Sequence, residues 1–217
     1  MKRLVVVLVT LLVLFSFVQP VRADDSLRVF YAGQDGGVKT ALELAKFILV
    51  NDSSQADVIV LNGVIPEDLS IPEGTGLVLI LGADMTEEQV SGLLGIPLVL
   101  RPMENPVSIT SLKVDDPLVT EIVWNGAPQV RERFDLQTPV SSVQPLVVAY
   151  ETGEWIVWKA HGNNFVVDAF LNDAVNPQIQ EWGYFNYLIY HLVERAAGRE
   201  PMSFAAYPVA PVPHEGE

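Results

Sequence analysis

The chain has 217 residues, a formal net charge of -14 at pH 7 and no cysteine. Its length suits one domain with a single substantial core, and an apolar content of 49% excludes a disordered chain. The acidic balance argues against nucleic acid as a partner, because such a surface repels phosphate backbones. The lack of cysteine excludes disulfides, thiol catalysis and zinc-thiolate sites.

The N-terminus has the three parts of a secretory signal peptide. Lys2 and Arg3 form a basic start, residues 4–18 are an apolar run, and Val21 and Ala23 stand at the -3 and -1 positions of a cleavage site. We therefore predict cleavage after Ala23 and an extracytoplasmic protein, secreted or associated with the cell envelope. The alternative is an uncleaved leader that anchors the chain in a membrane. Without a cysteine near the cut, a lipoprotein anchor is excluded.

The first half of the mature chain alternates strands and helices. Short apolar runs predict strands at residues 27–32 and 57–61, and apolar residues at helical spacing predict an amphipathic helix at 38–49. The stretch 74–88 is the most regular. Leu77 to Leu81 predicts a strand buried on both faces, since it is continuously apolar between glycines.

A turn and a helix follow this central strand. Gly82 turns the chain, and Thr86 is predicted to cap a helix over 87–94, with acidic residues in its first turn. Gly95 ends the helix, and residues 97–100 predict a fourth strand. This order is typical of a doubly wound, mostly parallel α/β sheet of the flavodoxin-like kind.

The second half has a different pattern. Residues 101–145 are rich in proline and predict an irregular excursion from the sheet. Three antiparallel strands are expected at 146–150, 155–160 and 165–170, as a hairpin extension of the sheet. A last helix, at 180–197, is apolar nearly all round and should pack deeply against the sheet. The domain is therefore expected to span residues 24–198, and the Pro-rich residues 199–217 are interpreted as a tail or linker.

Several motifs of these segments occur in a familiar order. They are Asp-Val-Ile-Val-Leu-Asn-Gly (57–63), Gly-Leu-Val-Leu-Ile-Leu-Gly (76–82), Asp-Pro-Leu (116–118), Pro-Leu-Val-Val-Ala-Tyr (145–150), Trp-Ile-Val-Trp (155–158), Asn-Phe-Val-Val-Asp-Ala-Phe (164–170) and Gln-Glu-Trp-Gly-Tyr-Phe-Asn-Tyr (180–187). In this order the chain, over about residues 27–198, resembles the class I glutamine amidotransferase-like fold. The likeness is to an exported branch found in extracytoplasmic parts of bacterial membrane-associated proteins.

The resemblance also implies a loss of activity. Amidotransferases of this family need a cysteine on the turn after the central strand and a partnering histidine, whereas this chain has Ala83 and Asp84 there. The resemblance therefore implies a domain without amidotransferase activity and without catalytic residues.

Other candidate sites are weaker. The segment from Gly33 to Thr40 nearly matches a phosphate-binding loop, but Val38 replaces its second glycine, so a Gly-rich turn before a helix is the better interpretation. If this turn bound a ligand, N–H groups at the helix start would favour a small anion or a carboxylate. The three histidines, His161, His191 and His214, have no metal-ligand spacing. The sequence thus indicates neither a metal nor a cofactor.

Polar residues at the ends of the predicted strands are the remaining candidates for a functional site. In a doubly wound sheet they converge at the carboxyl edge, where such folds bind ligands. The candidate ligand-binding residues are Gln34, Asp35, Gly36, Gly37, Asn62, Asp84, Asp173 and Glu181.

Two functions remain open. The first is a non-catalytic domain that binds a protein partner or a small ligand at the cell envelope. The alternative is a carboxylate-dependent hydrolase, acting on carbohydrate for example, which would need two acids about 5–9.5 Å apart in a cleft.

Overall fold

The computed structural model describes residues 26–112, 115–171 and 175–208, so the expected signal peptide lies outside the described residues. An eight-stranded sheet has the order β2-β1-β3-β4-β10-β9-β8-β6, and β5 and β7 form a second, two-stranded sheet. The elements are β1 (Arg28–Gly33), α2 (Gly37–Leu44), β2 (Ile48–Val50), η1 (Ser53–Gln55), β3 (Val58–Asn62), β4 (Gly76–Ile80), α3 (Glu87–Leu94), β5 (Val99–Met103), β6 (Ile109–Ser111), α4 (Pro117–Thr120), β7 (Arg133–Gln137), β8 (Gln144–Ala149), β9 (Trp155–Lys159), β10 (Asn164–Val167), α5 (Pro177–Gln180), α6 (Phe185–Ala196) and η2 (Phe204–Ala206).

The large sheet has a parallel and an antiparallel part. Strands β2, β1, β3, β4 and β10 run parallel to one another, whereas β9, β8 and β6 continue the sheet in antiparallel pairs. The order β2-β1-β3-β4 is that of flavodoxin-like folds. The predicted class is therefore confirmed: an α/β fold with a largely parallel sheet, an antiparallel extension and a packed C-terminal helix.

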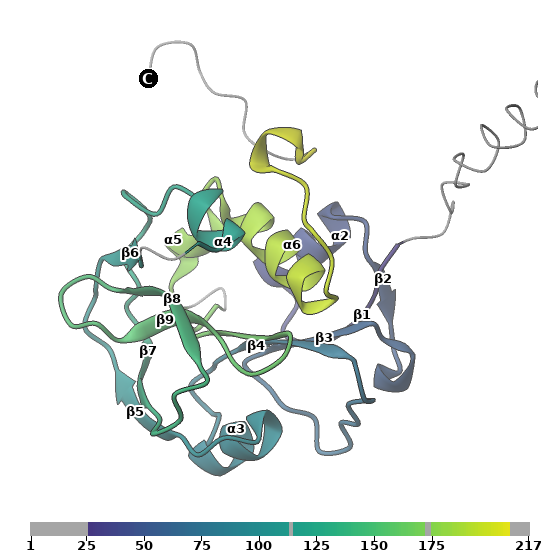
Figure 1. Cartoon of the computed structure of the whole chain (residues 1–217), viewed down its shortest axis with the longest axis horizontal. Coiled ribbons are helices and arrows are strands. Elements are labelled where there is room, and N and C mark those ends of the chain that lie inside the picture. Colours follow the sequence, from purple (N-terminus) through teal and green to yellow (C-terminus); the bar gives the residue numbers. More distant parts are fainter. Residues whose placement is uncertain (1–25, 113–114, 172–174, 209–217) are drawn as a thin grey trace, which may run out of the picture.

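Helices cover both faces of the sheet, with α2 and α6 on one side and α3 on the other (Figure 1). Alternation along the strands divides the core accordingly. In β3, Val58 and Val60 join the core beneath α6, whereas Ile59 and Leu61 join the core on the side of α3. All four side chains are completely buried, so the run is continuously apolar, as a doubly covered parallel strand requires.

The helix predicted over 38–49 is too long. It ends at Leu44, and Lys46 takes a left-handed backbone with φ of 61°. The next residues form the edge strand β2, which pairs with β1 in the register Arg28 to Ile48. The prediction failed because a short apolar run fits either a helix or a strand.

The predicted fourth strand and the irregular excursion are also corrected. β5 lies in the separate two-stranded sheet, paired with β7, and the segment 101–145 also contains β6 and α4. The fifth position of the parallel sheet is taken by β10, which is parallel to β4 and antiparallel to β9. The three predicted antiparallel strands exist, but the last one completes the parallel sheet.

The end of the chain differs from prediction in two ways. The last helix is divided into α5 and α6, with residues 181–184 between them. The expected linker does not begin at residue 199, because residues 199–208 pack along α6. Tyr207 is buried, Phe204 contacts the rings of Tyr184 and Tyr187, and the Tyr187 hydroxyl donates to the Met202 carbonyl at 2.8 Å. We call residues 199–208 the C-terminal strap.

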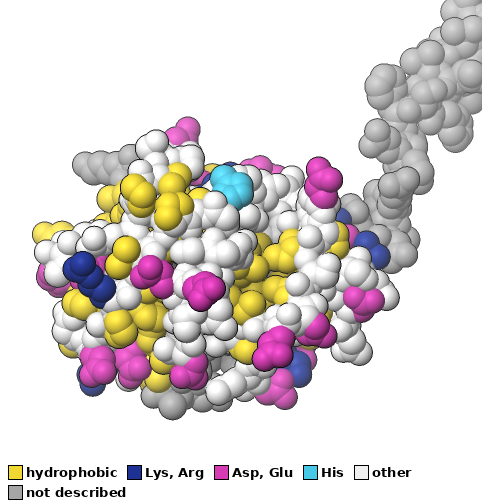
Figure 2. All heavy atoms as spheres, turned by 90° about the horizontal axis from the view of Figure 1, so that it is seen from below, with side chains coloured by type: hydrophobic (Ala, Val, Ile, Leu, Met, Phe, Trp, Pro, Cys, Tyr) yellow, Lys and Arg dark blue, Asp and Glu magenta, His cyan; other side chains and the backbone are white. Residues whose placement is uncertain are grey.

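The surface carries the acidic charge as scattered groups. On the face shown in Figure 2, Asp and Glu side chains are spread over the surface with few Lys or Arg side chains between them. Within the described residues, no helix has the length and apolar character needed to cross a membrane.

Candidate functional site

A pocket of about 410 Å³ lies at the carboxyl edge of the parallel strands. Residues that follow β1, β3, β4 and β10 meet there, which is where open α/β sheets bind ligands. Its lining residues are Gly33, Gln34, Asn62, Gly63, Val64, Leu81, Gly82, Ala83, Asp84, Phe170 and Leu171.

Two glycines bring the backbones together at the pocket. Gly63 has a left-handed φ of 73°, which residues with a side chain rarely adopt. A Cβ atom on Gly82 would lie 2.5 Å from the Gly63 Cα atom. The turns after β3 and β4 therefore touch through backbone atoms.

Gly82→Ala should destabilise the protein by about 1–3 kcal/mol, because the methyl group must push the two turns apart. Urea denaturation measures this loss. Gly92→Ala in α3 is the matched control, since nothing lies within 4 Å of a Cβ atom there. An equal effect of the two substitutions would contradict the close approach.

Asn62 orders the pocket through its amide group. Its Nδ2 atom donates to the Tyr31 hydroxyl at 3.3 Å and to the Leu171 carbonyl at 3.2 Å. The Tyr31 hydroxyl in turn donates to the Gln34 carbonyl. This chain of bonds connects the ends of β1, β3 and β10. In the described part of the chain, the Asn62 Oδ1 atom and the Gln34 amide keep no protein partner, so they are available to a ligand.

The turn after β4 carries Asp84 as the acidic residue of the pocket. It has the expected strand, turn and helix: Thr86 caps α3 in a capping box with Gln89, and Gly95 ends α3 in the left-handed conformation. Asp84 is exposed and has no ion pair within the described residues. None of the lining residues is a serine, cysteine, histidine or lysine. Within the described residues, the pocket thus offers hydrogen-bonding groups and one carboxylate, and no nucleophile with an adjacent base.

The structure brings together three of the predicted ligand-binding residues, Gln34, Asn62 and Asp84. Asp35 instead pairs with Lys39 at 2.6 Å. The N–H group of Gly37, which follows Gly36 at the start of α2, is occupied by the Gln180 Oε1 atom at 2.9 Å. The anion site considered at this helix start is therefore already filled by a protein group.

The remaining predicted residues lie elsewhere. Glu181 is exposed at the C-terminal cap of α5, and Asp173 lies outside the described residues. Among the residues that the structure describes, no three His, Cys, Asp or Glu side chains gather closely enough to hold a metal ion. His161 is an exposed turn residue, and His214 lies outside the described residues.

Sequence reasoning missed the contribution of Phe170 and Leu171. They follow β10, which was expected in an antiparallel hairpin and not beside β4. The apolar run from Phe165 to Val167 was the available signal, because all three side chains are fully buried in the middle of the sheet.

His191 and Asp168 are two of the ionisable groups that lie buried away from the pocket. His191 on α6 is fully buried, and neither ring nitrogen has a partner among the described residues. Burial, with a smaller contribution from Arg195, lowers the pKa of His191 to about 4. Asp168 accepts a hydrogen bond from the Phe134 backbone N at 2.8 Å, and burial raises its pKa well above the usual range.

These shifts have opposite effects on stability. Between about pH 6.5 and pH 4 the unfolded state protonates His191 and the folded state does not, so stability is lost as the pH falls, by about 3 kcal/mol for this group. The raised pKa of Asp168 stabilises the fold below about pH 3.8, and this contribution is lost as the pH rises through the folded pKa.

His191→Leu should therefore lose less stability than the wild type between pH 6.5 and pH 4, because it lacks the proton uptake on unfolding. Urea denaturation at a series of pH values measures this, and Asp168 is common to both proteins. Parallel pH profiles would contradict a lowered pKa of His191.

Comparisons with known proteins find likenesses to solved structures alone. No protein-family model and no curated protein matches the sequence. Among solved structures, the chain is similar to a protein from Thermoplasma acidophilum described as a candidate GMP synthase component, with 11% identity and a TM-score of 0.49 over 80% of this chain and 95% of that one. It is also similar to SMU.1228c, with 10% identity and a TM-score of 0.49 over 78% of this chain and 99% of that one.

A third similar structure is the exo-β-1,4-mannosidase Op5Man5 from Opitutaceae bacterium strain TAV5. The identity is 11% and the TM-score 0.43, over 82% of this chain and 36% of that one. At these identities all three likenesses are likenesses of fold.

Proposed function

We propose that the chain is an exported, non-catalytic domain with a glutamine amidotransferase-like fold that binds a small ligand or a protein partner at the cell envelope. The observation that carries the proposal is the composition of the strand-edge pocket. Ala83 and Asp84 occupy the turn where such a fold would place a nucleophile, and the described lining residues include no serine or cysteine and no histidine to activate one. Within the described residues, the pocket therefore lacks the nucleophile and the histidine that the amidotransferase reaction requires.

The polar groups of the pocket suit binding. The bonds of Asn62 and Tyr31 fix the strand ends, while the Asn62 Oδ1 atom and the Gln34 amide are available among the described residues. A volume of about 410 Å³ falls within the range of small-molecule sites. A prearranged site of this kind loses little conformational freedom when a ligand binds.

A carboxylate-dependent hydrolase receives no support from the described residues. Such an enzyme needs two acids facing one cleft, and Asp84 is the one acid among the lining residues. Asp35 is paired with Lys39, and Glu181 lies at the end of α5.

The absence of catalysis is tested directly with glutamine. Ammonia release should stay at the level of buffer alone, both for the full chain and for Asp84→Asn. Release that disappears in Asp84→Asn would show that the pocket is an active site.

Binding is tested by thermal shift with a panel of small polar compounds. A ligand at about 100 times its Kd stabilises the folded state by about 2.7 kcal/mol. The shift should shrink in Gln34→Ala, which loses a lining amide, and persist in Gln144→Ala, which loses an exposed amide outside the pocket. If both variants respond like the wild type to every compound that binds, the binding site lies elsewhere.

Export is tested by N-terminal sequencing. The exported protein should begin at Asp24, because the signal peptide is expected to be removed after Ala23. A protein that stays in membranes with Lys2 still present would instead support the anchored alternative.

A further inference from the structure

A second recess, of about 240 Å³, lies apart from the strand-edge pocket and shares no residue with it. Three segments that are distant in sequence surround it: the approach to β6, the approach to β7, and α5. Its lining residues are Pro106, Pro128, Gln129, Arg131 and Gln178. The recess is therefore defined by two prolines, two amides and one guanidinium.

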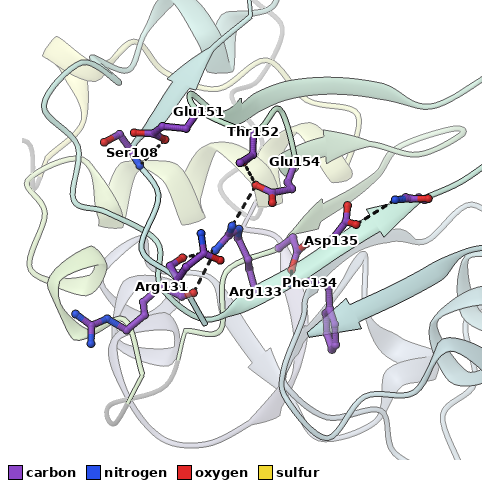
Figure 3. A network of polar contacts seen from close by, with 11 residues as sticks. Ser108, Arg131, Arg133, Phe134, Asp135, Glu151, Thr152 and Glu154 are labelled. Carbon is purple, nitrogen blue, oxygen red and sulfur yellow. Dashed lines mark hydrogen bonds and ion pairs between the residues drawn. The ribbon is translucent and has the colours of Figure 1, made fainter. Parts of the chain in front are cut away.

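Arg131 is the charged group of this recess, and its guanidinium is unpaired in the part of the chain that the structure describes. Three other arginines, Arg28, Arg133 and Arg195, are each held in an ion pair. Figure 3 shows the Arg131 side chain extending away from Arg133, so that its guanidinium lies outside the buried polar network.

The backbone around Arg131 is fixed from two sides. Val107 and Val130 exchange two backbone hydrogen bonds, at 2.9 and 3.0 Å, which hold the two approaches side by side. On the other side, the completely buried Arg133 donates to the carbonyls of Asn105 at 2.7 Å and Arg131 at 3.2 Å. These contacts fix the positions of Pro106 and Arg131 relative to each other.

Asn176 attaches α5 to the same assembly. Its Oδ1 atom accepts from the Arg131 backbone N at 2.7 Å, and its Nδ2 atom donates to the Glu132 carbonyl at 2.9 Å. Because Asn176 is the N-cap residue of α5, this clamp sets the position of Gln178 in the recess with Arg131. The backbone of the recess is thus held in place by bonds to buried side chains, whereas the side chains of Gln129, Arg131 and Gln178 are exposed and open to a ligand.

We propose that this recess binds a carboxylate group. A guanidinium presents paired N–H donors that match the two oxygens of a carboxylate. The amides of Gln129 and Gln178 have no protein partner among the described residues and supply further donors. No acid is among the five lining residues. The net charge of -14 disfavours a doubly charged phosphate more than a singly charged carboxylate.

Two sources present such a group, the C-terminus of a peptide and a sugar acid. Both are tested by NMR titration of the full chain, observing the side-chain N–H signals of Arg131, Gln129 and Gln178. The probes are N-acetyl-alanyl-alanine, its uncharged C-terminal amide, glucuronate and inorganic phosphate. At least one carboxylate should give saturable shifts with a Kd in the range of about 1 to 10 mM, and the uncharged amide should give none. The probe that binds identifies the source.

Arg131→Gln should weaken this binding about tenfold or more, because it removes the charged pair of donors. Arg101→Gln is the matched control: Arg101 is exposed on β5, outside the recess, and its loss changes the net charge equally. Gln178→Ala is a second variant that keeps the charge and should also weaken binding. These tests are independent of the strand-edge pocket.

Several results would overturn the proposal. Arg131→Gln and Arg101→Gln would weaken binding equally, or the uncharged amide would bind as tightly as its acid. Phosphate would bind more tightly than either carboxylate, or neither carboxylate would saturate the shifts up to about 50 mM.

Discussion

Arg133→Met should lower the free energy of unfolding by roughly 3–5 kcal/mol, because it leaves a buried carboxylate without its counter-charge. The Arg133 side chain is 0% exposed and that of its partner Glu154 is 8% exposed, and their ion pair measures 3.1 Å. Methionine would fill much of the volume but could not donate to Glu154 or to the carbonyls of Asn105 and Arg131. Urea denaturation measures the loss.

A double variant separates charge from packing. Arg133→Met combined with Glu154→Leu removes both charges, and it should recover part of the stability lost in Arg133→Met alone. Figure 3 shows Glu154 also accepting from the Thr152 hydroxyl. If the double variant is less stable than Arg133→Met, the pair stabilises mainly through packing and its carbonyl bonds, and the unpaired carboxylate is not the main cost.

The second large effect is expected on α6. Phe185→Ala should cost about 3–5 kcal/mol, since the ring is 1% exposed in the core beneath the helix. Removing the C-terminal strap should also be costly, by roughly 2–4 kcal/mol, because Tyr207 is 4% exposed and stacks on Tyr190. Thermal melts of a chain ending at residue 200 and one ending at residue 208 isolate the strap.

The strap is expected to stabilise the fold through the buried ring of Tyr207, whereas a linker would contribute nothing to stability. Tyr150→Ala is the control, because Tyr150 is an exposed aromatic whose loss removes a ring without removing core packing. It should leave the melting temperature nearly unchanged. If the chain ending at residue 200 melts at the same temperature as the chain ending at residue 208, the strap does not contribute to stability.

The sequence predicted best where local signals agreed with one another. A buried strand, a turn and a helix were predicted from the apolar run 77–81, the glycine turn, the Thr86 cap and Gly95. The strand β4 begins and ends one residue earlier than predicted, and α3 has the expected bounds and caps. Each of these signals acts within a few residues, so no knowledge of distant contacts was needed.

The sequence-based predictions were wrong where contacts between distant residues determine the structure. Ile48 to Val50 became a strand because β1 offered an edge for pairing, and β10 became parallel because it lies beside β4. The strap was missed because prolines suggest a linker, whereas the tyrosines of α6 provide partners for Met202 and Phe204.

The candidate site was predicted in part for the same reason. Gln34, Asn62 and Asp84 were identified because each lies at the end of a predicted parallel strand. Phe170 and Leu171 could not be identified from the sequence, because their place in the pocket depends on the pairing of β10 with β4.

The position of β10 also determines the order in which the fold can be completed. β4 is paired on one side by β3, which is near in sequence, and on the other by β10, which begins 84 residues after Ile80 at Asn164. Until residues 164–167 have been synthesised, the edge of β4 that pairs with β10 has no partner, and the apolar faces of β4 are only partly covered. The nascent chain therefore passes through a stage with an open, aggregation-prone strand edge in the middle of the future sheet. A protein built in this way benefits from being held unfolded until β10 has been synthesised.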